Sequence, residues 1–107
     1  MAKPLNEGAG ALLPALRSAV LDGPGVLSAE TRRAAAAATL TTPVLADYVD
    51  RVRHRAHRTT DANIDELRSA GLGDDEIFEL TIATALGAAL HRLERGLAAI
   101  DSAEDPE

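Results

Sequence analysis

Large apolar residues recur along this chain every three or four positions, which is the spacing of one face of an α-helix. No segment shows the two-residue alternation of a half-buried strand. The sequence therefore predicts an all-α fold, a compact domain of about five helices. Apolar stripes run through three of them: Leu12, Leu13, Leu16 and Val20; then Leu45, Tyr48, Val49, Val52 and Ala56; then Phe78, Ile82, Leu86, Ala89, Leu93, Leu97 and Ile100.

Two helices are rich in small residues. Ser28 is a good N-cap for a helix that continues to about Leu40 and is centred on five alanines at 34–38. This helix has no apolar stripe of its own, so we expect it to pack tightly between larger neighbours. Small residues at 83–89 likewise give the last helix, which begins at 73–76, a smooth surface on which another helix can pack closely.

Capping and breaking residues divide the middle of the chain. Thr42 followed by Pro43 is typical of a helix start, because proline at the first helical position loses no hydrogen bond. The helical pattern weakens at residues 59–60. A short fourth helix, capped by Thr60 or Asp61, then runs to residue 70, and Gly71 suits the left-handed position that closes it.

The chain of 107 residues is long enough for one domain. Residues 1–10 lack periodicity and are interpreted as a flexible leader. Residues 11–100 form the helical domain, and residues 101–107 are interpreted as an acidic, disordered tail. Much of the apolar content is alanine, which buries little area, and such a thin core favours a homo-oligomer.

Charge and cysteine usage exclude several functions. A net charge of −6 argues against binding to nucleic acid and to anionic membranes, both of which favour basic surfaces. The sequence has no apolar run of about 20 residues that would span a bilayer. There is no Cys, which excludes thiol chemistry and disulfides. We expect a cytoplasmic protein without a nucleic-acid or membrane partner.

The densest group of polar residues lies at 47–58. On a helix, Asp50, His54 and His57 share one face, and Asp61 would join them if the helix continued. Two imidazoles flanked by carboxylates suit a divalent metal site, or an acid–base pair formed by His54 and His57. The alternative, which we favour, is a solvated polar face with local ion pairs, because the neighbouring arginines repel a cation. No cofactor is expected, and a divalent metal is the minority interpretation.

Arginines at 51, 53, 55 and 58 form a basic cluster in this acidic chain. Through bidentate contacts, Arg53 and Arg58 are candidates to hold a small carboxylate ligand beside Tyr48. The alternative is that the arginines pair with nearby aspartates. Tyr48, the only tyrosine, is interpreted as a core residue whose hydroxyl lies at the edge.

The segment DELRSAGLGDDEIFEL at residues 65–80, followed by the small-residue helix at 81–90, resembles the carboxymuconolactone decarboxylase and alkyl hydroperoxidase D-like superfamily. The resemblance covers about residues 42–97. It implies an alkyl hydroperoxidase D-like helical fold and assembly into trimers or hexamers. Redox members carry Cys-x-x-Cys and a later His, and these positions fall near Ala56, Thr59 and Asn63. The proton-relay glutamate falls near Val44. The resemblance therefore implies the fold without thiol peroxidase chemistry.

Three hypotheses follow for the function. The first is an oligomeric ligand-binding or accessory protein. The second is a decarboxylase or lactone-type enzyme, in which His54 or His57 is the acid–base and an arginine is the carboxylate clamp. The third is a metal-binding helical protein that uses Asp50, His54, His57 and Asp61.

Overall fold

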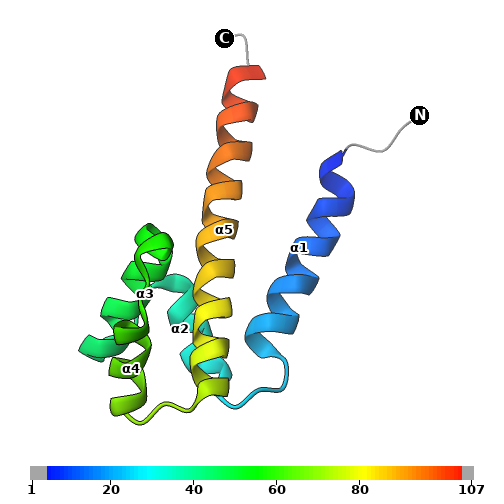
Figure 1. The fold of residues 1–107 in the computed structure, drawn as a ribbon. Helices are drawn as coiled ribbons and strands as arrows, with labels where there is room; N and C mark the ends of the chain where they lie inside the picture. The colour runs from blue at the N-terminus through cyan, green and yellow to red at the C-terminus, as the bar shows by residue number, and fades with distance from the viewer. Residues whose placement is uncertain (1–4, 105–107) are drawn as a thin grey trace.

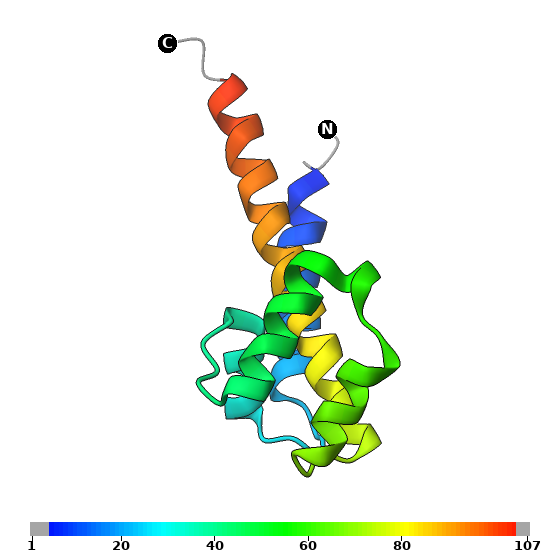
Figure 2. The ribbon, with the colours of Figure 1, turned by 60° about the vertical axis from the view of Figure 1, so that its left-hand side comes forward.

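The computed structural model describes residues 5–104, with side chains described from residue 12 to residue 102. Over this range the protein is all-helical, as predicted, and no strand occurs in it. The elements are α1 (Leu5–Asp22), α2 (Ala29–Ala37), α3 (Pro43–Arg55), the short 3₁₀ helix η1 (Ala56–Arg58), α4 (Asp61–Ser69) and α5 (Asp74–Glu104). α5 runs the length of the molecule, with α1 on one side and α3 and α4 on the other (Figures 1 and 2).

Both ends of the helical domain extend further than the sequence predicts. The expected leader at 1–10 is wrong from residue 5 onward, because α1 begins at Leu5. Pro14 therefore lies inside α1 rather than in its first turn. The expected disordered tail is wrong for residues 101–104, which continue α5. Residues 1–4 and 105–107 lie outside the described range.

The predicted caps position α2 and α3. The Ser28 hydroxyl accepts a hydrogen bond from the Thr31 amide at 3.1 Å and so satisfies one free donor at the start of α2. α2 ends earlier than predicted, because Ala38 adopts a left-handed conformation with φ of 57°. Pro43 occupies the start of α3, as predicted, and Thr42 precedes it without a side-chain capping bond.

The predicted break after α3 and the start of α4 are both confirmed. At the start of α4 the Thr60 amide donates to Asn63 Oδ1 at 2.8 Å, which is one half of a capping box. Gly71 has a φ of +100°, the left-handed conformation predicted for the turn that follows. Across this turn Arg68 Nε donates to Asp74 Oδ1 at 2.9 Å. That hydrogen bond and the charge of Asp74, with a smaller contribution from Asp65, raise the pKa of the exposed Arg68 above its usual value.

The core forms where α2, α3 and α4 cover the first half of α5. Its buried apolar residues are Leu21, Ala35, Tyr48, Val49, Leu67, Ile77, Leu80 and Ala83. α2 lies very close to α5, since a Cβ at Gly87 would lie 2.6 Å from Ala36 Cα. The predicted close packing on the small-residue surface of α5 is therefore confirmed, and the alanines of α2 are the partner.

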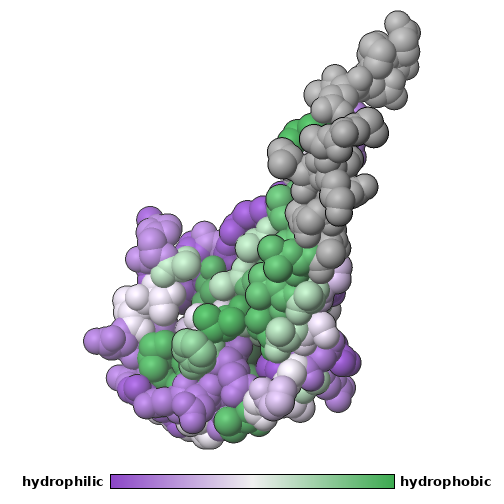
Figure 3. Space-filling view, turned by 90° about the vertical axis from the view of Figure 1, so that its right-hand side faces the viewer, coloured by the Kyte–Doolittle hydropathy of each residue, from purple (hydrophilic) through white to green (hydrophobic). Residues whose placement is uncertain are grey.

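Several large apolar side chains of α1, of the loop after it and of α5 remain at least 40% exposed. Figure 3 shows a green, hydrophobic band with purple surroundings on the side of the molecule where α1 lies in Figure 1. The exposed large apolar residues are Leu12, Leu16, Val26, Phe78, Ile82, Leu93, Leu97 and Ile100, which are between 40% and 66% exposed.

Candidate functional site

A hollow of about 200 Å³ lies beside α3, at the end of α2. We call it the α3 hollow. One part of its lining is apolar and the other part is polar and charged. The lining residues are Ala38, Leu40, Ala46, Val49, Asp50, Arg53 and His54. Two of the predicted site residues, Arg53 and His54, therefore come together at a concave surface.

Arg53 is held in place from α2. Its Nη1 donates to the Ala36 carbonyl oxygen at 3.0 Å, and the side chain is half-buried. A guanidinium has five N–H donors, so this bond leaves donors for a further partner. Such a fixed, planar donor group is suited to binding a carboxylate.

His54 and Asp50 form a local pair on the exposed rim of the hollow. His54 Nε2 lies 3.8 Å from Asp50 Oδ1, and both side chains are more than half exposed. Arg55 also contacts Asp50, with 3.3 Å between Nη2 and Oδ2. Exposed pairs of this kind contribute little to stability, so they leave His54 free to rearrange around a ligand.

His57, Arg58 and Asp61 do not continue this face, because α3 ends at Arg55. Arg55 takes φ of −146° and ψ of 42°, and η1 then carries His57 and Arg58 as exposed residues. The condition for Asp61 to align with His57, an uninterrupted helix, is therefore not met. Within residues 12–102, no three His, Asp or Glu side chains are grouped closely enough to hold a metal ion.

Tyr48 does not line the α3 hollow. It is only 5% exposed and belongs to the core, as one interpretation of the sequence predicts. Its hydroxyl is 2.7 Å from the Thr81 hydroxyl oxygen on α5, so the two side chains share a hydrogen bond. That Tyr48 binds a ligand stays a prediction, and in this structure its hydroxyl is paired with Thr81.

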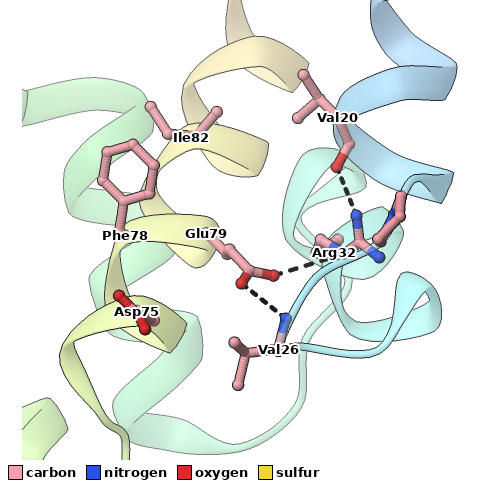
Figure 4. A pocket seen from close by; sticks show the side chains of 8 residues that line it. Val20, Val26, Arg32, Asp75, Phe78, Glu79 and Ile82 are labelled. Carbon is pink, nitrogen blue, oxygen red and sulfur yellow. Dashed lines mark hydrogen bonds and ion pairs between the residues drawn. The ribbon is translucent and has the colours of Figure 1, made fainter.

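A second, larger hollow of about 370 Å³ lies where the loop after α1 meets α5, and Figure 4 shows its lining. We call it the loop hollow. Phe78, Ile82, Val20 and Val26 contribute apolar surface to it. Sequence reasoning missed this hollow, because it depends on where a loop of residues 23–28 lies against α5.

An arginine and a glutamate fix that loop in place. Arg32 is 5% exposed and donates to the carbonyl oxygens of Val20, Gly23 and Leu27 at 2.6–3.2 Å. Glu79 accepts from the Val26 and Leu27 amides at 2.7 and 3.1 Å. The two charged groups approach to 4.0 Å. Since these charges are occupied with the loop, they serve the fold rather than a charged ligand.

No protein-family model, no curated protein and no solved structure matches this chain. The resemblance to the carboxymuconolactone decarboxylase and alkyl hydroperoxidase D-like superfamily therefore stays a prediction. In addition, no helix within residues 5–104 combines the length and the apolar character needed to cross a membrane.

Proposed function

We propose that this protein is a cysteine-free relative of the carboxymuconolactone decarboxylase and alkyl hydroperoxidase D-like superfamily. In this proposal it binds a small carboxylate ligand as a homo-oligomer in the cytoplasm. Support for the relationship comes from the order of its elements, in which a capped helix ends at Gly71 and a long small-residue helix follows. A trimer or a hexamer is the expected assembly, and thiol peroxidase chemistry is excluded because the chain has no Cys.

The observation that carries the ligand proposal is the composition of the α3 hollow. Arg53 supplies a positive charge and fixed donors, and Leu40 and Ala46 supply apolar wall, while the carboxylate of Asp50 in the same lining is paired with His54 and Arg55. A carboxylate with a short apolar body matches both parts of this lining. The volume of about 200 Å³ is below the roughly 300–1,000 Å³ of pockets that hold drug-sized ligands, so the hollow suits a smaller molecule.

Backbone amide NMR tests this proposal with two matched probes, benzoate and its neutral counterpart benzamide. We expect benzoate to shift amide signals around Ala38, Leu40 and Arg53, and benzamide to shift them weakly. Replacing Arg53→Gln should weaken benzoate binding by about tenfold or more, since a hydrogen bond to a charged group contributes about 1.5–3 kcal/mol.

The matched control is Arg95→Gln, which removes an exposed arginine of α5 that does not line the α3 hollow. Benzoate binding should be unchanged in this variant. Equal shifts from benzoate and benzamide, or equal losses in the two variants, would show that no carboxylate site exists at Arg53. Far-UV circular dichroism checks that Arg53→Gln still folds, because this change also removes the bond to the Ala36 carbonyl.

A second candidate function is the decarboxylase or lactone-type reaction. Its specific support is that His54 lines the same hollow as Arg53, so an acid–base group and a carboxylate clamp adjoin one space. His57 does not line that hollow. Turnover of a β-keto acid or a simple lactone that is lost in His54→Gln and kept in His57→Gln would favour the enzyme. For the metal-binding alternative, the only remaining support among the described residues is the contact between Asp50 and His54.

A further inference from the structure

From residue 86 onward, α5 carries a regular series of large apolar residues, which we call the α5 seam. It comprises Leu86, Leu90, Leu93, Leu97 and Ile100. The steps between them are alternately four and three residues, as in the seam along which helices pair in a coiled coil. Leu93, Leu97 and Ile100 are 40%, 41% and 54% exposed, so the seam has no complete partner within the chain.

α1 covers the α5 seam only in part. The two helices leave a hollow of about 190 Å³ between them, lined by Leu13, Pro14, Arg17, Leu90, Leu93, Glu94 and Leu97. Leu12 and Leu16 of α1 are themselves 66% and 44% exposed. In Figure 1 the beginning of α1 leans away from the end of α5. Two apolar helices are thus presented side by side with space between them.

The accessible surface of the chain is larger than its mass predicts. It amounts to 7300 Å², whereas a compact monomer of 11.2 kDa exposes about 5,700 Å². A stable interface between two proteins covers about 800 Å² on each partner. The surplus is therefore large enough to include one such interface.

The charges around the α5 seam permit the same surface to face itself. Among residues 12–22 and 86–102, three arginines (17, 92 and 95) accompany three acidic residues (Asp22, Glu94 and Asp101). This region is electrically balanced, although the whole chain has a net charge of −6. A second copy therefore meets no net like-charge repulsion here, while a strongly basic or acidic partner gains no net attraction.

We propose that a second copy of this chain covers the α5 seam, with the two α5 helices antiparallel about residue 95. Leu93 then lies opposite Leu97 of the second copy, and Leu90 opposite Ile100. The two α1 helices flank this pair and complete a four-helix bundle. The inference deepens the oligomer part of the proposed function. Because a two-fold contact joins copies in pairs, it predicts a dimer or a larger assembly with an even number of subunits, which excludes a trimer.

The first test measures subunit number by native mass spectrometry and light scattering. Leu97→Glu places a charge in each half of the seam and should raise the dissociation constant of the pair by about 100-fold or more. Ala99→Glu is the matched control, since residue 99 lies about 200° around the helix from residue 97. It should leave the assembly intact. A trimer, a monomer, or equal behaviour of the two variants would overturn the proposed pairing.

The second test keeps the seam unchanged and measures its direction. Because the chain has no Cys, Ala85→Cys and Ala99→Cys each provide a single site for a spin label. In the antiparallel pair, the two copies of residue 85 are separated by about 30 Å along the helix axes and those of residue 99 by about 12 Å. A parallel pair would bring both positions to about 8–10 Å between axes, and this result would also overturn the proposal. Neither outcome bears on benzoate binding at Arg53, so the two proposals fail separately.

Discussion

The two halves of α5 have similar apolar content and opposite surroundings. In the first half, Leu80, Ala83 and Thr84 are fully buried against the other helices. In the second half, Leu93 and Leu97 are about 40% exposed. Exposure of single apolar residues is ordinary on a monomer, but a contiguous apolar surface usually marks an interface.

The difference arises from the shape of the helix surface rather than from its hydrophobicity alone. Gly87 lets α5 approach the backbone of α2 at Ala36, and this contact buries the side of α5 that carries the smallest residues. Phe78 and Ile82 lie on another side and are exposed even though they belong to the first half. Burial therefore follows the approach of the neighbouring helices, and the large residues on the other sides of α5, such as Phe78 and Ile82, remain exposed.

The largest effect in the buried region is expected from Arg32→Met, which keeps the side-chain volume and removes the charge. It leaves three carbonyl oxygens without their donor and Glu79 without its opposite charge. We expect a loss of about 3–5 kcal/mol in the free energy of unfolding, measured by urea denaturation. Arg33→Met is the matched control, because its pair with Asp22 is exposed and should contribute less than about 1 kcal/mol. Equal losses would mean that the loop is not held by Arg32.

Two leucine-to-alanine substitutions compare the two halves of α5 directly, and their expected effects are smaller. Leu80→Ala leaves a cavity in the core and should cost about 2–5 kcal/mol of unfolding free energy. Leu97→Ala removes a side chain that the single chain leaves 41% open, so the loss should be under about 1 kcal/mol at concentrations where the protein is monomeric. Denaturation at several protein concentrations checks this. If the loss of unfolding free energy in Leu97→Ala grows with protein concentration, a second copy covers this residue. A large loss that does not depend on concentration would contradict the exposure of Leu97.

Much of this fold is readable from local chemistry. Ser28, Thr60 and Gly71 mark helix ends through capping bonds or backbone conformation, which depend on neighbouring residues alone. The extent of α1 and α5 was underestimated because Gly8 and Gly10 have low helix propensity, and because acidic residues are unfavourable at the negative end of a helix dipole. The apolar stripe of α5 was found, but periodicity identifies a face without identifying its partner. For that reason, the burial of one side and the exposure of another could not be predicted.

The candidate site was predictable only within a single helix. Arg53 and His54 were found because they lie close together on α3. The hollow that they line is also formed by residues at the end of α2, and these come near α3 only in the folded chain. His57 was misplaced because the prediction carried α3 beyond Arg55, where it ends, and the condition under which Asp61 would have joined it is not met. Arg32 was missed altogether, since its partners are backbone atoms of a loop that carries no side-chain signal.

The smallest effects come from the two glycines that mark the two halves of α5. Gly87→Ala forces a methyl group against the Ala36 backbone and should cost about 1–3 kcal/mol of unfolding free energy, measured by urea denaturation. At Gly96 a new Cβ would meet no heavy atom within 4 Å. Gly96→Ala should therefore stabilise the chain by about 0.5–1 kcal/mol, because alanine loses less conformational freedom in a helix. If Gly87→Ala lowers the unfolding free energy and Gly96→Ala raises it, close helix packing is confined to the first half of α5. A cost at Gly96 in dilute protein would instead place a close neighbour beside the second half of α5, which would require α1 to lie nearer to it than it does here.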